Sequence, residues 1–415
     1  MSRFAMPRPA SAGRGIVVWC SLLLAASAGC GDGGGGEKIP LPPADGRQFR
    51  TIEAFEAGYW NRPIPHQGAA ATANDSLHPA TCGSCHTLQY QDWQTALHSK
   101  AYSPGLEGQL VWWEANDYAS VEQCQVCHAP LTEQQAQLVD YQAGTTTPNP
   151  SYDPTLQRQG ITCAACHLRG GQGHGPPLRD GATPPPVAGA AHGGSIRTEF
   201  FERSDFCAGC HQFAEPAING KSLQNTNAEW AASRYPAEGK ICQSCHMPDR
   251  RHLWRGIHDS TMTRNGVTIT FERSGRNTVV LRVTNTATGH QFPTYVTPKV
   301  VVVVEQLDAA GSPLPDGRTE GTIGRSVEGT ATGWIELYDT RIAPDSSFQL
   351  QATIVPGAVS ARAVITVHPD GFYDGMFASL LSGNLSDTSR VLIAEAKRRT
   401  AASPYQIYVE TLPIR

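Results

Sequence analysis

The sequence predicts a multidomain protein in which a loop-rich, mainly short-helical domain is followed by an all-β sandwich domain. Three observations lead to this prediction. All ten cysteines beyond residue 30 lie between Cys82 and Cys245. The chain holds 41 Gly and 30 Pro but only 17% charged residues, which favours loops and short elements over long ones. Beyond residue 262 the cysteines stop and runs of β-branched residues begin.

The cysteines of the first domain form five copies of one pattern, Cys-x-x-Cys-His. The copies begin 35 to 44 residues apart, at Cys82, Cys124, Cys163, Cys207 and Cys242. Their second cysteines are Cys85, Cys127, Cys166, Cys210 and Cys245, and their histidines are His86, His128, His167, His211 and His246. The pattern is the attachment signature of c-type haem, in which two thiols bind one haem and the adjacent His binds its iron. The sequence therefore predicts five covalently bound haem c groups.

Chance and the usual alternative uses of cysteine do not account for this pattern. Random placement of 12 Cys and 14 His in 415 residues gives about 0.01 such motifs per chain. Structural zinc sites combine two cysteine pairs into one four-ligand set, whereas each pair here has its own histidine. A disulfide framework is also disfavoured, because the motifs use every cysteine beyond residue 30.

Residues 1–30 have the features of an export signal. Arg3, Arg8 and Arg14 precede an apolar run from Ile16 to Ala26, and this run is too short to span a membrane. The segment ends in Ser-Ala-Gly-Cys30 and resembles a bacterial lipoprotein signal with Cys30 as the lipidated residue, although Ser27 stands where Leu is usual. Plain cleavage and release is the alternative. Both alternatives predict a periplasmic or cell-surface protein, and the lipoprotein prediction adds a membrane anchor through Cys30.

A flexible Gly- and Pro-rich linker is predicted over residues 31–45, and the haem domain over residues 46–262. Within that domain the residue pattern predicts helices over Leu88–His98 and Glu133–Tyr141, and a loop over Gly170–Gly194. The formal net charge of −4 gives no indication of nucleic-acid binding.

Five irons each need a second axial ligand, and nine histidines remain outside the motifs. The candidates in the first domain are His98, which lies on a predicted helix, and His174 and His192, which lie in Gly-rich segments. His252 and His258, which flank Trp254, are candidates for a further site. For the last pair we expect His258 to be the ligand, with His252 as the alternative. The other four histidines are His66 and His78 in the first domain and His290 and His368 in the sandwich.

Four of the motif segments resemble one family. These segments are Cys82-Gly-Ser-Cys85-His86 with Tyr90, Trp93 and His98, then Cys124-Gln-Val-Cys127-His128-Ala-Pro130, Gly160-Ile-Thr-Cys163-Ala-Ala-Cys166-His167, and Cys242-Gln-Ser-Cys245-His246-Met-Pro248. They resemble the multihaem cytochrome family that includes the nitrifier tetrahaem electron carrier, with hydroxylamine oxidoreductase as a more distant relative. The resemblance covers about residues 78–262, and it implies a stack of mostly bis-histidine haems that relay electrons.

Residues 263–415 are predicted to form a β-sandwich of the immunoglobulin-like kind. The predicted strands are Val267–Glu272, Thr278–Asn285, Lys299–Leu307, Ser347–Ile354, Arg362–His368 and Tyr405–Thr411, with a helix over Thr388–Arg399. His290 follows the second of these strands in a Gly-His-x-x-Pro turn, where Gly289 permits a close backbone approach and Pro293 stiffens the exit. A similar turn follows the haem region in members of the family just named, and it implies that His290 is a haem ligand.

These observations favour an exported pentahaem cytochrome that transfers electrons between other redox proteins, rather than a catalyst. Six-coordinate irons suit that function, because no ligand has to exchange. One alternative is an oxidoreductase that acts on a small nitrogen or sulfur species at a five-coordinate haem. The pentahaem nitrite reductases that it would resemble use Lys at the catalytic motif, whereas all five motifs here end in His. A further alternative is a structural subunit of an extracellular electron conduit.

Overall fold

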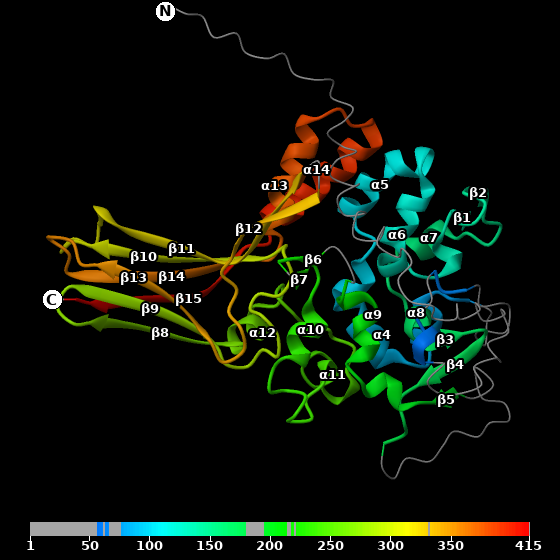
Figure 1. Ribbon diagram of the computed structural model, residues 1–415, viewed down its shortest axis with the longest axis horizontal. Helices are drawn as coiled ribbons and strands as arrows, with labels where there is room; N and C mark the ends of the chain where they lie inside the picture. Colours follow the sequence, from blue (N-terminus) through cyan, green and yellow to red (C-terminus); the bar gives the residue numbers. More distant parts are fainter. Residues whose placement is uncertain are drawn as a thin grey trace, which may run out of the picture.

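The computed structural model describes residues 56–60, 63–65, 76–179, 195–213, 217–219, 221–330 and 333–414. The predicted export signal, the linker, Cys30, His66 and His192 lie outside these residues. In the described part of the chain, no helix is long and apolar enough to cross a membrane. Short helices and small sheets form one region, and longer strands form a second, elongated region beside it (Figure 1).

The first region consists mainly of short helices, as the sequence predicts. Its first half contains α3 (Pro79–Gly83), α4 (Thr87–Thr95), η1 (Leu97–Lys100), α5 (Pro104–Asn116), α6 (Tyr118–His128), η2 (Thr132–Gln134), β1 (Gln137–Asp140), β2 (Thr145–Pro148), α7 (Pro154–Gln157), α8 (Cys163–His167), β3 (Leu168–Arg169) and β4 (Gln172–Gly175). Its second half contains β5 (Ser195–Arg197), η4 (Glu199–Glu202), α9 (Asp205–His211), β6 (Ala217–Ile218), β7 (Lys221–Ser222), α10 (Thr226–Ala231), α11 (Cys242–His246), η5 (Pro248–Arg250) and α12 (Ser260–Asn265).

Two of the predicted segments in this region differ from the structure. The helix predicted over residues 88–98 ends at Thr95, and His98 lies in the following turn η1. The helix predicted over residues 133–141 is wrong, because that segment forms η2 and strand β1. Gln134 explains the break: its buried side-chain amide donates to the carbonyls of Leu156 and Gly160, at 2.9 and 2.8 Å, and thus ties the segment to the chain near α7. Strand β4 also interrupts the predicted loop from residue 170.

The second region is a sandwich of two antiparallel sheets. One sheet has the order β12-β11-β10-β14-β15 and the other has the order β13-β9-β8. The strands are β8 (Val267–Ser274), β9 (Thr278–Asn285), β10 (Lys299–Leu307), β11 (Pro313–Thr330), β12 (Gly333–Asp339), β13 (Ser347–Thr353), β14 (Ser360–His368) and β15 (Tyr405–Pro413). The six predicted strands and the helix now labelled α14 (Asp387–Ala401) are therefore confirmed, whereas the immunoglobulin-like topology stays a prediction.

The sandwich has one continuous apolar core between its sheets. Alternate residues of β10, namely Val300, Val302 and Val304, point inward and are fully buried, and they pack with Leu281 of β9 and Ile365 of β14. Each such side chain contributes about 1.5–3 kcal/mol to the stability of the fold. In the helical region, by contrast, the buried apolar residues form several small and separate clusters.

A helical hairpin and a buried arginine join the two regions. Helices α13 (Gly371–Ser382) and α14 follow the sandwich strand β14 and pack on α5 of the first region (Figure 1). The contact is close, since a Cβ atom at Gly105 of α5 would lie 2.6 Å from the Phe377 ring. Arg325 of β11 is completely buried and donates to the carbonyl of Ser222 in β7 at 2.6 Å. The loops of the sandwich are therefore held in place against the first region.

Candidate haem-binding site

The five Cys-x-x-Cys-His motifs take similar local structures. In α6, α8, α9 and α11 the motif histidine is the last residue of a short helix, and in the first motif the histidine lies between α3 and α4. One helical turn separates two residues three apart, so both thiols of a motif lie on the same side of the helix. The arrangement has the donor set that a covalently attached haem requires.

The motifs come together in pairs that are distant in sequence. The Cys82 and Cys163 side chains interact, which brings the first motif next to the third. The Cys207 and Cys242 side chains interact in the same way, which brings the fourth motif next to the fifth. The ten motif cysteines do not form disulfides in the structure.

Three histidines from outside the motifs face motif histidines. The ring centres of His98 and His211 are 6.3 Å apart, those of His252 and His167 are 6.1 Å apart, and those of His290 and His246 are 6.3 Å apart. Two imidazoles on opposite sides of one iron, each bonded at about 2 Å, have ring centres about 6 Å apart. All three pairs therefore fit the spacing of a bis-histidine haem.

The hydrogen bonds of three motif histidines select the nitrogen that a metal would use, whereas Nδ1 of His211 lies 3.3 Å from the side-chain amide nitrogen of Gln224. Nδ1 of His128, His167 and His246 lies 2.8, 2.8 and 2.6 Å from the backbone carbonyls of Ala101, His174 and Arg255. A carbonyl can only accept, so in each case Nδ1 carries the proton and Nε2 carries the lone pair. This second contact of a ligating histidine orients the ring and makes the other nitrogen more basic.

Five of the histidines outside the motifs divide into two groups by the same criterion, whereas the buried Nδ1 of His98 has no hydrogen-bond partner among the described residues. Nδ1 of His174, His252 and His290 lies 2.9, 3.0 and 2.9 Å from a backbone carbonyl, as in the motif histidines. In contrast, Nε2 of His78 lies 2.8 Å from the Asp153 carboxylate, and Nε2 of His258 lies 3.0 Å from the Asp370 carboxylate. His258, our expected ligand, therefore uses the nitrogen that iron would need, whereas its alternative His252 faces His167.

Burial keeps several of these imidazoles neutral. Burial, assisted by the nearby His211, lowers the pKa of His98 to about 3. Burial also lowers the pKa values of His167, His174 and His211 to about 4. A histidine binds a metal only in its deprotonated form, so these side chains are in the state for metal binding at neutral pH.

Two interactions that the sequence did not reveal hold His252 and the loop of His290 in place. Asp92 of α4 is 4% exposed, and its carboxylate accepts two hydrogen bonds from the guanidinium of Arg251, at 2.7 and 2.6 Å, and one from the backbone N–H of His252 at 3.0 Å. The only signal in the sequence is an acidic residue directly before Trp93. Such a residue is ordinarily read as a solvated charge.

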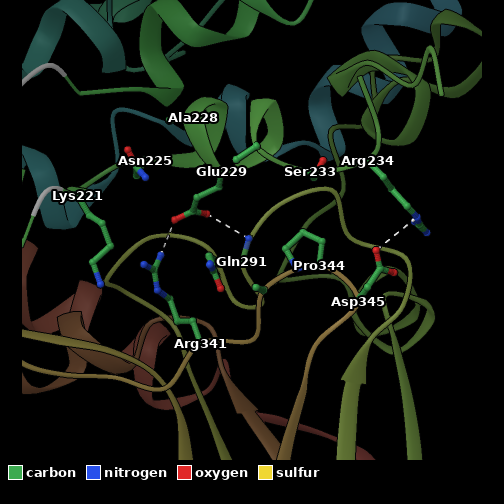
Figure 2. A pocket seen from close by; sticks show the side chains of 12 residues that line it. Lys221, Asn225, Ala228, Glu229, Ser233, Arg234, Gln291, Arg341, Pro344 and Asp345 are labelled. Atoms are coloured by element: carbon green, nitrogen blue, oxygen red, sulfur yellow. Dashed lines mark hydrogen bonds and ion pairs between the residues drawn. The ribbon is translucent and has the colours of Figure 1, made fainter. Parts of the chain in front are cut away.

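The second interaction fixes the loop that carries His290 (Figure 2). Glu229 of α10 accepts a hydrogen bond from the Gln291 backbone N–H at 3.2 Å and forms an ion pair with Arg341 at 2.8 Å. Both charged side chains are buried, with 5% and 1% of their surfaces exposed. These residues line a cavity of about 450 Å³ between α10 and the loops of the sandwich, and Lys221 and Asp345 lie at its sides. A Cβ atom added to Gly289, the residue before His290, would lie 3.2 Å from the Trp230 ring, so the backbone packs closely against this ring.

Not every candidate ligand faces a motif histidine. The ring of His174 packs edge-on against Tyr59, with ring centres 6.0 Å apart. His192 lies outside the described residues. His368 is half-buried at the end of β14, where its backbone pairs with Lys299 of β10.

Part of the first region is similar to a known family, and the fold is similar to that of a solved structure. Residues 81–168 match the family model of cytochrome c554 and c-prime. The fold is similar to the crystal structure of a penta-heme cytochrome c552 from Thermochromatium tepidum, with a TM-score of 0.55 and 18% sequence identity over 81% of this chain and 99% of that chain. A search of the curated proteins finds no match. Together these likenesses support a multihaem c-type cytochrome with covalently bound haem and a general role in electron transfer.

Proposed function

We propose that this protein is an exported pentahaem c-type cytochrome that relays electrons between other redox proteins. Residues 46–262 hold one haem c at each of the five motifs, and residues 263–415 form a sandwich domain that completes one of the sites. The observation that carries the proposal is the set of three histidine pairs with ring centres 6.1 to 6.3 Å apart. Haem supplies the one-electron chemistry, and the chain sets each potential through axial ligands, burial and hydrogen bonds.

The pairs support an assignment of the axial ligands. His98 is the distal ligand at the fourth motif, His252 at the third and His290 at the fifth. His252 replaces His258 in this assignment, because the Nε2 atom of His258 contacts Asp370. For the first and second motifs, His174 and His192 remain the candidates. Because His290 belongs to the sandwich domain, that domain is part of the redox unit.

The motif contacts give an order for electron transfer. The first and third motifs adjoin through Cys82 and Cys163, and the fourth and fifth adjoin through Cys207 and Cys242. The third and fourth are linked by His252 and His98, which both contact the same indole ring of Trp254. The second motif adjoins the fourth, because Nδ1 of His128 donates a hydrogen bond to the carbonyl of Ala101. Ala101 lies three residues after His98, the ligand proposed for the fourth motif. The proposed order is thus first, third, fourth and fifth, with the second as a branch.

The haem count and the ligation state can be measured on the purified protein. Mass spectrometry of the mature chain should show five covalent haem additions, and four or fewer would mean that a motif is silent. The ferric optical spectrum should be dominated by low-spin iron. A spectrum dominated by high-spin iron would contradict the electron-relay proposal.

A second candidate function is catalysis on a small nitrogen or sulfur species at the second motif. One observation favours it: among the residues that the structure describes, no histidine ring faces His128. The phenols of Tyr295 and Tyr373, beyond the first region, both interact electrostatically with the Cys124 thiol. Burial raises the pKa of Tyr373 to about 12, so its hydroxyl keeps its proton and can donate a hydrogen bond. Added cyanide or nitrite should then shift a high-spin band, and an unchanged spectrum would contradict this candidate.

We further propose that Cys30 is lipidated and that the linker over residues 31–45 tethers the protein to a membrane. The support is the run of small residues that ends in Cys30, a thiol that no haem motif uses. A Cys30→Ala variant should appear in the soluble fraction. If that variant remained bound to the membrane, the anchor would have to be elsewhere.

A further inference from the structure

Trp254 lies where three of the haem sites meet. Its indole ring packs edge-to-face against His98, with ring centres 4.7 Å apart and planes at 78°, and against His252, with ring centres 5.0 Å apart and planes at 84°. These are the distal ligands that we propose for the fourth and third motifs. The backbone N–H of Trp254 also donates to the carbonyl of His246, the motif histidine of the fifth site, at 3.0 Å.

The backbone of Trp254 has an unfavourable conformation. Its φ angle is +41°, in the left-handed region that bulky residues rarely occupy. Such a conformation persists only where the surrounding contacts fix it, and such residues are concentrated at functional sites. A Gly at this position would adopt the same φ angle without strain.

The contacts around Trp254 fix the conformation from both sides. Before it, Arg251 is held by the buried carboxylate of Asp92. After it, the guanidinium of Arg255 donates to the carbonyl and hydroxyl oxygens of Thr95, at 3.0 Å each, and the carbonyl of Arg255 accepts from Nδ1 of His246 at 2.6 Å. The segment is therefore attached to α4 and to the fifth motif at the same time.

An edge-to-face contact of this kind restricts the rotation of an imidazole. The torsion between Cβ and the ring of a histidine is broad and soft, so neighbours decide the ring orientation. The planes of His98 and His211 make an angle of 65°, whereas those of His252 and His167 make an angle of 33°. The angle between two axial imidazole planes controls the splitting of the iron d orbitals, and with it the electron paramagnetic resonance signal and the potential.

We infer that Trp254 is a positioning residue that fixes the ring orientations of His98 and His252 together, and thereby sets the ligand fields of two adjacent redox centres. The inference rests on the proposed function, because it takes these two histidines as axial ligands. One side chain then controls neighbouring steps of the relay, and a change in its packing alters both centres while it leaves the others unchanged.

Substitution of Trp254 in the full-length, haem-loaded protein tests this inference. In W254G the new residue accepts the positive φ angle, so that loss of the ring is separated from backbone strain. We expect two of the low-spin ferric signals to shift or broaden and the midpoint potentials of two haems to change. W254F keeps an aromatic ring and should restore much of the original spectrum. W112F is the control: Trp112 in α5 is 45% exposed, and its substitution should leave every signal in place.

The outcomes separate the inference from the proposed function. Five haems and a low-spin wild-type spectrum test the proposed function without any substitution. Signals and potentials in W254G that match those of the wild type would overturn the inference alone. If W254G failed to accumulate, W254L would remove the aromatic contact and retain an apolar side chain, and unchanged signals in W254L would overturn the inference equally.

Discussion

At the scale of single residues, hydrogen bonds distinguish His252 from His258. His252 and His258 are six residues apart in one segment, yet only His252 has its Nδ1 atom on a backbone carbonyl and its ring opposite a motif histidine. His258 instead contacts the carboxylate of Asp370. The sequence could not separate the two, because both flank Trp254 and the choice depends on a residue 112 positions away.

The two histidines form a matched pair for mutagenesis. His252→Ala should convert one haem to a high-spin form, because the third motif loses the imidazole that faces His167. His258→Ala should leave the spectrum low-spin and should lower the stability only by about 1 kcal/mol, since it removes a half-exposed hydrogen bond. Ferric optical spectra of the two variants decide. A high-spin band in the His258 variant alone would reverse the assignment.

At the scale of elements, glycines let the chain pass close to the ligand segments. Gly160 leads into the third motif with a φ of +64°, and a Cβ atom there would lie 2.7 Å from the carbonyl oxygen of His98. Gly144 has nearly the same φ, +63°, but an added Cβ atom would meet nothing within 4 Å. The two positions therefore separate backbone strain from steric overlap.

Alanine substitutions at these glycines should differ in their effects. Gly144→Ala should cost about 1 kcal/mol of stability from its backbone conformation alone. Gly160→Ala should cost about 2–4 kcal/mol, because η1 must also move, and it should perturb the haem that His98 ligates. Urea unfolding measures the first quantity and the ferric spectrum measures the second. Equal losses of stability and unchanged ferric spectra in both variants would show that the close approach of residue 160 to His98 does not affect the fold or the haem.

The elements of the sandwich differ in how far the sequence predicts them. β9 and β10 are continuous β-branched runs with alternating burial, and the sequence predicts both within their observed bounds. β11 has a polar, Gly-rich sequence, and it becomes a strand because it pairs with β10, for example Val300 with Ile323. This pairing is tertiary, so local propensity does not reveal it. The sequence does not predict helix α13 either, because Gly371 and Gly375 weaken its helical pattern.

Helix α10 provides a further test, since it attaches the His290 loop to the helical region. Glu229→Gln removes one buried partner of Arg341, which keeps its ion pair with Asp339. We expect a loss of about 3 kcal/mol in the free energy of unfolding and a high-spin fraction at the fifth haem. Glu238→Gln is the control: this residue forms exposed ion pairs with Arg234 and Lys240, and its substitution should leave the free energy of unfolding nearly unchanged. Similar costs for both substitutions would contradict the proposed role of Glu229.

At the scale of the whole molecule, the proposed function makes the sandwich and the helical region one redox unit. The sandwich contributes His290, the buried Arg325 that donates to β6 and β7, and the helical hairpin that packs on α5. The sequence predicts the five motifs and a ligand at His290 from local patterns. It does not predict which histidine faces which motif, because the pairs join residues 44 to 113 positions apart.

The central claim is that three histidines from outside the motifs form axial pairs with His167, His211 and His246. An experimental structure of the purified, haem-loaded protein tests it most directly. We predict an iron between the rings of each pair, with both Nε2 atoms at about 2 Å from the metal. An iron at any of these three motifs whose sixth ligand is water or another side chain, with the facing histidine turned away, would contradict the account.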